Sequence, residues 1–338
     1  MSVQGIQLET FFKEGLRRIL AEEDESDTLL WARTQLDRMG GADESAVLTW
    51  PESFDYTDAL VAKYEELARL PAEQRQVLDW KWKQWNTYIM PLEAGMLATL
   101  TAPDGMGKST YAEMIAEHWA EHRNRVCYVH YELNKAVMMQ RRLARHALVT
   151  VRDIRSGQLT PEQKARVRAV RPMLAEWAGQ ITYIHAPGWT MERTVDELRK
   201  QHAEGACDAV VVDYLEKVAA SSRQMKMRME WFQREADNVE QLKTFAESVG
   251  VPVVMVAQMR KDAKSKDMAQ VGRGDMRGAG EKSEKANLVV LLNRKREADG
   301  YSNEVDVLID KNTMGQAGVQ FKQLMRPEYF DVRDLVTA

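Results

Sequence analysis

The sequence predicts an α/β fold in which a mostly parallel central sheet is flanked by helices and preceded by an α-helical N-terminal extension. Two observations carry this prediction. From Met96 onward, apolar runs of strand length alternate with longer helical patterns, whereas the residues before it place apolar side chains at helical spacing between polar breaks. Near-continuous apolar runs are typical of strands buried on both faces, and helices between them favour parallel connections. The expected strands lie at 97–101, 126–130, 181–185, 209–212, 253–257, 288–292 and 305–309.

The first ninety residues are expected to form helices that dock on another surface and carry no chemistry. In one of them, over residues 59–70, Leu60, Tyr64 and Leu67 lie on one stripe, and a proline follows the helix. The change of pattern places a domain boundary near residues 86–95. The chain is therefore divided into an N-terminal docking region, 1–90, and a sheet domain, 91–338.

Composition describes an ordinary soluble globular protein. The 338 residues include 47 basic and 51 acidic side chains, for a net charge of −4, and 44% of all residues are hydrophobic. These values exclude a disordered chain, a collagen-like fibre and a coiled-coil rod. No run approaches the roughly 18 apolar residues of a membrane span, and the N-terminus lacks a secretory pattern. Cys127 and Cys207 have no metal-type spacing, which predicts two buried thiols and a cytoplasmic location.

Charge is unevenly distributed along the chain. Residues 1–90 hold 17 acidic and 10 basic side chains, whereas residues 260–296 hold 11 basic and 5 acidic ones. A local basic cluster binds nucleic acid even where the whole chain is weakly acidic, because the field that a phosphate meets is local. The second segment is therefore a candidate for a nucleic-acid contact.

One segment has the pattern of a phosphate-binding loop. It lies between the first expected strand and an expected helix over 111–120, and it reads Ala102-Pro103-Asp104-Gly105-Met106-Gly107-Lys108-Ser109-Thr110. The two glycines let backbone N–H groups turn toward phosphate oxygens, and the helix N-terminus adds partial positive charge. Lys108 is expected to reach the β and γ phosphates of ATP, and the Ser109 hydroxyl to ligate Mg²⁺, with Thr110 as the alternative. The first position of the pattern is Ala102 rather than glycine.

Polar side chains end three other expected strands. Asp213 ends the fourth and is predicted to bind Mg²⁺ beside the phosphate loop. Glu132 follows the second strand, which is expected to neighbour the phosphate-loop strand, and it is assigned as the carboxylate that activates water. Gln258 ends the fifth and is the candidate sensor of the γ-phosphate. His130 is expected to point to the other face of its strand and is assigned to the core.

The basic segment after Gln258 is the candidate DNA contact. Its proposed ligands are Arg260, Lys261, Lys264, Lys266, Arg273, Arg277 and Gly278. A glycine-rich basic loop offers backbone N–H groups and mobile cations to phosphates, which gives sequence-independent binding. Because the segment contains no aromatic residue, base stacking is not expected. A solvated loop is the alternative, and Arg223, Lys226 and Arg228 form a second candidate patch.

In this order, the segments resemble the RecA-like ATPase core of the DnaB-type replicative helicase family, over roughly residues 90–333. The phosphate loop, like that of the family, starts with alanine. Glu132 resembles the family's catalytic glutamate, and the segment after it, 138–144, also resembles the family, which implies a nucleotide contact for Arg141. Three further segments resemble the family's metal-binding strand, its sensor strand and a DNA-contacting loop, and they are 212–215, 251–258 and 274–280.

The resemblance implies a function. The family forms ring hexamers, binds ATP with Mg²⁺ between subunits, and moves along single-stranded DNA in a central channel. The chain is therefore expected to be an ATP-hydrolysing, ring-forming DNA helicase or translocase that acts in DNA replication. The alternative is an ATP-binding regulatory or assembly factor of the same family that does not unwind DNA.

Two departures from the family pattern bear on this expectation. A late strand of the family ends in a Lys-x-Arg pair that reaches the γ-phosphate of the neighbouring subunit. Here Lys311 matches the lysine, and Thr313 stands in place of the arginine. Either Lys311 acts alone, another arginine such as Arg294 substitutes, or hydrolysis is slow. Residues 1–90 do not resemble the family's N-terminal domain, and a primase or a loader is the partner considered for them.

Overall fold

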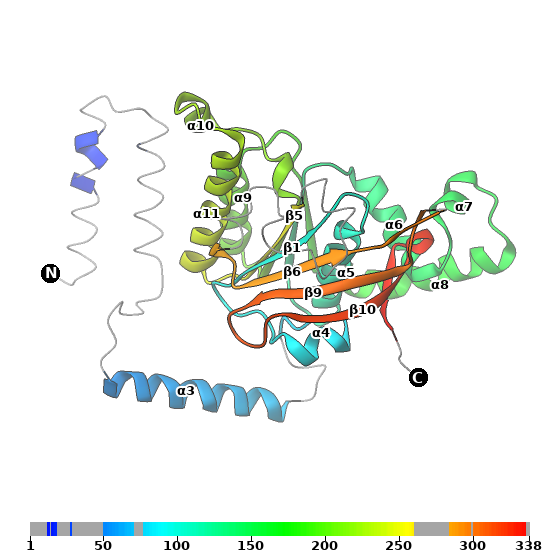
Figure 1. Cartoon of the computed structure of the whole chain (residues 1–338), viewed down its shortest axis with the longest axis horizontal. Helices are drawn as coiled ribbons and strands as arrows, with labels where there is room; N and C mark the ends of the chain where they lie inside the picture. The colour runs from blue at the N-terminus through cyan, green and yellow to red at the C-terminus, as the bar shows by residue number, and fades with distance from the viewer. Residues whose placement is uncertain are drawn as a thin grey trace.

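The computed structural model describes residues 12–13, 15–18, 28, 50–70, 77–259, 284–298 and 300–335. Its centre is a nine-stranded sheet with the strand order β11-β10-β9-β6-β1-β5-β4-β2-β3 (Figure 1). Six strands run parallel to one another, and they are β1 (Leu97–Ala102), β2 (Val126–His130), β3 (Ile181–His185), β4 (Ala209–Asp213), β5 (Val253–Gln258) and β6 (Leu288–Asn293). The other three form an antiparallel edge, and they are β9 (Glu304–Asn312), β10 (Val319–Arg326) and β11 (Asp331–Asp334).

The prediction of a mostly parallel α/β sheet is confirmed, and all seven expected strands are present. The last of them is β9, which runs antiparallel to β6. The sequence analysis did not predict β10 or β11, or the short hairpin of β7 (Arg296–Glu297) and β8 (Gly300–Tyr301). The reason is visible in β10, where exposed Gln320 and Lys322 interrupt the apolar residues. An antiparallel edge can leave one face in water, so its strands lack the continuous apolar run of a buried parallel strand.

Helices cover both faces of the sheet. The α-helices include α3 (Trp50–Arg69), α4 (Lys83–Tyr88), α5 (Lys108–Glu121), α6 (Lys135–Ala147), α7 (Val151–Ser156), α8 (Pro161–Ala178), α9 (Met191–Ala203), α10 (Ser222–Lys226) and α11 (Trp231–Val249). Successive residues of β1 show the division, because Ala98 packs with the side chains of α5, whereas Leu97 packs with those of α9 and α11. In this chain the alternation of side chains along the strands thus sends neighbouring residues into separate cores on the two faces of the sheet.

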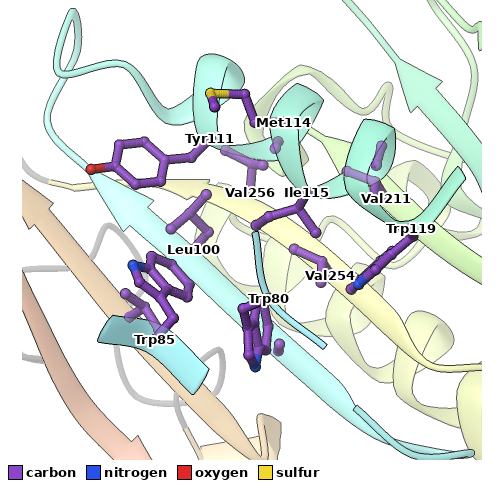
Figure 2. Close-up of a cluster of buried hydrophobic side chains, with 14 of the residues drawn as sticks. Trp80, Trp85, Leu100, Tyr111, Met114, Ile115, Trp119, Val211, Val254 and Val256 are labelled. Carbon is purple, nitrogen blue, oxygen red and sulfur yellow. The ribbon is translucent and has the colours of Figure 1, made fainter. Parts of the chain in front are cut away.

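A tryptophan-rich segment before β1 belongs to the sheet domain. Trp80, Trp82 and Trp85 are at most 3% exposed, and Figure 2 shows Trp80 and Trp85 beside Leu100 of β1. The indole N–H of Trp85 donates to Gln323 Oε1 of β10 at 3.0 Å, and that of Trp82 donates to the backbone carbonyl oxygen of residue 332 at 2.9 Å. The expected boundary at residue 90 therefore divides a segment that packs as one unit with the sheet. A boundary before residue 77 fits this packing.

Helix α3 confirms a helix in the N-terminal extension, and it begins earlier than the expected 59–70. It stands apart from the sheet in Figure 1, and its Phe54, Val61 and Tyr64 side chains are exposed. No helix among the described residues is long and apolar enough to span a bilayer. Cys127 and Cys207 are both buried free thiols, as predicted.

The parallel strands bring the predicted polar residues to one edge of the sheet. In register, Ala102 at the end of β1 pairs with Gln258 at the end of β5, and His130 at the end of β2 pairs with Asp213 at the end of β4. The carboxyl ends of parallel strands form the crevice where ligands bind in open α/β sheets. This edge is therefore the candidate site.

Candidate nucleotide-binding site

The phosphate loop connects β1 to α5, as the sequence predicted. Gly105 and Gly107 have φ angles of 82° and 98°, which lie in the left-handed region that favours glycine. A Cβ atom on Gly107 would also lie 2.1 Å from the terminal methyl carbon of Met325 on β10. The left-handed backbone conformation therefore favours glycine at this position, and a side chain would also require the flexible end of Met325 to move.

Lys108 lies inside the turn of the phosphate loop. Its Nζ donates to the backbone carbonyl oxygens of Ala102 at 2.9 Å and Pro103 at 3.2 Å, and it is 3.7 Å from the Asp104 carboxylate. Burial lowers the pKa of Lys108, and the negative charge of Asp104 partly opposes that shift. A cation held in a loop of backbone N–H groups is suited to phosphate oxygens.

Asp213 forms the buried end of the site. It has no exposed surface, and its Oδ1 accepts a hydrogen bond from the Ser109 hydroxyl at 3.2 Å, while Oδ2 accepts one from the Tyr128 hydroxyl at 2.9 Å. Burial raises the pKa of Asp213, and the charges of Lys108 and Arg141 act in the opposite direction. The structure thus brings together the two residues that were predicted to hold Mg²⁺.

The donor set around Asp213 fits Mg²⁺ bound together with phosphate. A carboxylate and a hydroxyl are oxygen ligands, and Mg²⁺ is usually held by one or two protein groups plus phosphate oxygens and water. Within the described ranges, no group of three or more histidine, cysteine, aspartate or glutamate side chains is arranged to hold a metal by itself. A cation at Ser109 and Asp213 would therefore need oxygens from the nucleotide.

Glu132 lies at the predicted edge of the sheet, but the strand before it, β2, neighbours β4 rather than β1. The expectation that β2 neighbours β1 is wrong, because β5 and β4 lie between them. The neighbour of β2 on this side is β4, so the segment that carries Glu132, which follows β2, lies beside the end of the Asp213 strand. The Glu132 side chain is 50% exposed, and its Oε1 lies 3.7 Å from Lys217 Nζ. Burial, followed by the charge of Glu132, raises the pKa of Tyr214.

His130 is a site residue that the sequence analysis missed. It is buried, as expected of a core residue, but the expectation that it points away from the site is wrong. Its Nε2 lies 3.3 Å from Asp213 Oδ2, and its Nδ1 accepts hydrogen bonds from the backbone N–H groups of Glu132 and Leu133. Burial lowers the pKa of His130 to about 4. The sequence signal that could have identified His130 is its two-residue spacing from Tyr128, which places both rings on the Asp213 face of β2.

Gln258 connects the sensor strand to the phosphate loop. Its side-chain amide donates to Asp104 Oδ2 at 2.5 Å, and its backbone N–H donates to Glu216 Oε1 at 2.9 Å. The charge of Glu216 also raises the pKa of Lys108, against the larger effect of burial. Glu216 was not predicted, because its place beside β5 depends on the path of the chain after β4.

Arg141 lies on α6 and is held by two contacts. Its Nη1 is 3.4 Å from Glu113 Oε1 on α5, and its guanidinium carbon is 4.7 Å from the centre of the Phe330 ring. Its charge lowers the pKa of Asp213 against the larger effect of burial. Arg141 is thus near Asp213, and its predicted nucleotide contact stays a prediction.

Lys311 and Thr313 lie at the opposite, amino-terminal edge of the sheet. Lys311 pairs with Val289 of β6, its Nζ donates to the backbone carbonyl oxygen of Glu284 at 2.7 Å, and the Thr313 N–H donates to the backbone carbonyl oxygen of Asn287 at 2.9 Å. Because β9 is antiparallel to β6, its end is remote from the phosphate loop at the carboxyl edge. Arg294 is buried and bonded to the backbone carbonyl oxygens of Ser302 and Tyr301.

The predicted DNA ligands lie outside the described residues. This holds for the whole set, which is Arg260, Lys261, Lys264, Lys266, Arg273, Arg277 and Gly278. The segment that contains them follows Met259, directly after β5, whose last residue is Gln258. In the second candidate patch, Arg223 forms an ion pair with Asp237, whereas Lys226 and Arg228 are exposed.

Comparisons with known proteins agree with this arrangement. The family described as DnaB-like helicase C terminal domain matches residues 78–329. The replicative DNA helicase DnaB of Geobacillus stearothermophilus is 24% identical over 272 residues, which cover 77% of this chain and 58% of that protein. The replicative DNA helicase DnaC of Bacillus subtilis is 21% identical over 268 residues, again 77% of this chain and 58% of that protein. The chain thus spans less than two thirds of these relatives.

Solved structures share the fold. The ATPase domain of G40P superimposes with a TM-score of 0.70 at 18% identity, over 83% of this chain and 98% of that domain. A DnaB-like replicative helicase, whose structure was described with its interactions with primase, gives a TM-score of 0.72 at 15% identity, over 98% of this chain and 76% of the other. At these identities, the superpositions show a common RecA-like fold.

Proposed function

This chain belongs to the DnaB-like helicase C-terminal domain family, and from that membership we propose that it hydrolyses ATP with Mg²⁺ and moves along single-stranded DNA. We further propose that it does so as a ring, as a helicase in DNA replication. The observation that carries the proposal is the cluster of Lys108, Ser109 and Asp213 around a glycine loop at the carboxyl edge of the sheet. Phosphoryl transfer from ATP requires a phosphate-binding loop, a cation close to the phosphates, and oxygen ligands for Mg²⁺.

Each residue of the cluster has a separate task in this proposal. The backbone N–H groups of residues 105–109 and Lys108 bind the β and γ phosphates, and Ser109 and Asp213 hold Mg²⁺. The bound cation would neutralise charge that develops on the phosphate oxygens. Asp213 accepts hydrogen bonds from Tyr128 and Ser109, and these bonds orient its carboxylate.

Glu132 is the proposed acceptor of a proton from the attacking water. Its exposed side chain reaches solvent. Its backbone N–H donates a hydrogen bond to His130, which lies next to Asp213. Gln258 would exchange its bond to Asp104 for a contact with the γ-phosphate. Since the segment from residue 260 follows this strand closely, such an exchange would transmit the state of the nucleotide to the proposed DNA contact.

We propose a ring because Lys311 lies remote from the phosphate loop of its own chain. Lys311 lies on β9 toward the amino-terminal edge of the sheet, so it can serve the γ-phosphate of a neighbouring copy better than that of its own. Thr313 carries no charge, which leaves Lys311 as the proposed cation supplied between subunits. A hexamer is the ring size that the family implies. Residues 1–90 remain candidates for a contact with a primase or a loader.

The central experiment is the rate of ATP hydrolysis with and without single-stranded DNA. We expect DNA to raise the rate in the wild-type chain. A variant in which Lys261, Lys264 and Lys266 are neutralised should bind DNA more weakly and show a smaller salt dependence of binding. Neutralising Lys200 of α9, on a helix that covers a sheet face, provides the control.

The alternative function is an ATP-binding regulatory or assembly factor that does not separate strands. The observation that favours it is Thr313 in place of the arginine. A forked DNA substrate distinguishes the two functions, because only a helicase releases the displaced strand when ATP is added. Hydrolysis that does not respond to DNA, with no strand release, would support the alternative.

A further inference from the structure

His130 lies between the backbone of Glu132 and the side chain of Asp213. It ends β2, is 3% exposed, and its Nδ1 accepts hydrogen bonds from the backbone N–H groups of Glu132 at 3.0 Å and Leu133 at 3.1 Å. On the other side of the ring, Nε2 lies 3.3 Å from Asp213 Oδ2. One imidazole therefore contacts both the backbone that carries Glu132 and the side chain of Asp213.

The contacts define the tautomer of His130. A ring nitrogen that accepts two N–H groups carries no proton, so the proton of the neutral imidazole is assigned to Nε2. That atom is buried and lacks a hydrogen-bond partner among the described residues, although it faces the carboxylate. The ring of Tyr128 stacks on His130 with a centroid distance of 6.0 Å, and its hydroxyl donates to the same Asp213 oxygen. Nε2–H of His130 and the Tyr128 hydroxyl thus both face Asp213 Oδ2.

The segment that His130 anchors is short. Helix α6 begins at Lys135, and Asn134 caps it by accepting a hydrogen bond from the Val137 N–H. Three residues therefore connect the end of β2 to the helix cap, and two of them donate their backbone N–H groups to His130. Without these bonds, the two donors next to a buried side chain would need other partners. The imidazole thus determines the direction in which Glu132 leaves the sheet.

We propose that His130 is a positioning residue that couples the water-activating carboxylate to the metal carboxylate: Nδ1 fixes the backbone of Glu132, and Nε2 restrains Asp213. The proposal rests on the function proposed above for Glu132 and Asp213. The two halves of the ring have separable tasks. Outer partners that orient site residues typically contribute about 10- to 100-fold to metal affinity or activity.

Two substitutions separate the tasks of the ring. Asn Oδ1 reaches the position of Nδ1, so His130→Asn keeps the acceptor for the backbone and removes the group that faces Asp213. The longer side chain in His130→Gln reaches the position of Nε2 and removes the acceptor at Nδ1. The measurements are amide hydrogen exchange of Glu132 and Leu133, the Mg²⁺ midpoint for binding a fluorescent ATP analogue, and kcat against KM for ATP.

The two variants are expected to fail in opposite ways. His130→Asn should keep the amide protection and kcat within about threefold, and raise the Mg²⁺ midpoint about tenfold. His130→Gln should lose the protection and lower kcat about tenfold or more, with KM and the Mg²⁺ midpoint within about threefold of wild type. His185, which pairs with His130 in register at the end of β3 and is exposed, supplies the control, because His185→Asn should change none of these values.

Equal behaviour of His130→Asn and His130→Gln in all three measurements would overturn the proposal, because it would mean that the ring only fills space. Glu132→Gln is measured in parallel to test the proposed function itself. If Glu132→Gln loses turnover while both His130 variants keep wild-type values, the positioning role is wrong and the function of Glu132 stands. If Glu132→Gln turns over normally, the function of Glu132 is wrong, and opposite changes in amide exchange and Mg²⁺ midpoint still support the coupling.

Discussion

Asp213 and Glu132 follow neighbouring parallel strands at the same edge of the sheet, and the fold surrounds them in different ways. Asp213 has no exposed surface and lies beside Ser109, Tyr128 and His130. The Glu132 side chain is 50% exposed, and its side-chain ion-pair partner is the equally accessible Lys217. A metal ligand gains from being fixed before the cation arrives, whereas a group that activates water must meet solvent. The two carboxylates should therefore differ in what their replacement does to stability, even where both replacements stop hydrolysis.

The largest effect is expected from Lys108→Ala, which removes the cation of the phosphate loop. Loss of the phosphate contact should abolish ATP binding and turnover, while the circular dichroism spectrum keeps its α/β form. Lys200→Ala, an exposed lysine on α9, is the matched control. Normal affinity for ATP in Lys108→Ala would show that the loop does not bind phosphate.

Glu132→Gln should lower ATP turnover by about 10²- to 10⁴-fold, the range of a lost general base. Binding of an ATP analogue should be retained, because the amide has nearly the same shape and size. The free energy of unfolding should stay within about 0.5 kcal/mol of wild type, since the side chain is exposed. Glu204→Gln, at an exposed position after α9, is the control for both measurements. Turnover near the wild-type rate would place the base elsewhere.

Asp213→Asn tests the other half of the comparison. Mg²⁺-dependent binding of the analogue should be lost, as for any removed metal ligand. In EDTA, however, the variant should be more stable than wild type by about 1 kcal/mol, because the hydrogen bonds and nearby positive charges only partly offset the desolvation cost of the buried Asp213 carboxylate. Urea unfolding measures this difference. A variant much less stable than wild type would mean that the hydrogen bonds to Asp213 outweigh the cost of its charge.

The smallest effect concerns the amino-terminal edge. If Lys311 acts on a neighbouring copy, Lys311→Ala should lower turnover several-fold. Thr313→Arg should raise it by about two- to tenfold, because a planar guanidinium binds a phosphate through two donors. Turnover is measured over a range of protein concentrations, since only assembled copies can share a site. A fast wild-type rate that Lys311→Ala leaves unchanged would remove Lys311 from the mechanism.

Much of the site follows from local sequence. The loop 102–110 was predicted in full, because its glycines answer a backbone requirement: both adopt positive φ. Asp213 and Gln258 were predicted from their places at strand ends. His130 and Glu216 were not predicted as site residues, because each is placed in the site by a contact with a residue that is distant in sequence. His130 was assigned to the wrong face of β2, although its spacing from Tyr128 indicated the right one.

The sequence by itself determined the seven apolar strands and the place of the glycine loop between β1 and α5. Runs of apolar residues specify strands, and the glycine pattern before Lys108 specifies the backbone of the turn, because both depend on neighbours along the chain. Only the tertiary structure decided that β5 and β4 separate β1 from β2, that β9 turns antiparallel, and that Trp80, Trp82 and Trp85 join the core. Strand order and the partners of a buried side chain depend on contacts between residues distant in sequence. A one-dimensional pattern of hydrophobicity does not encode which of several similar apolar strands pairs with which.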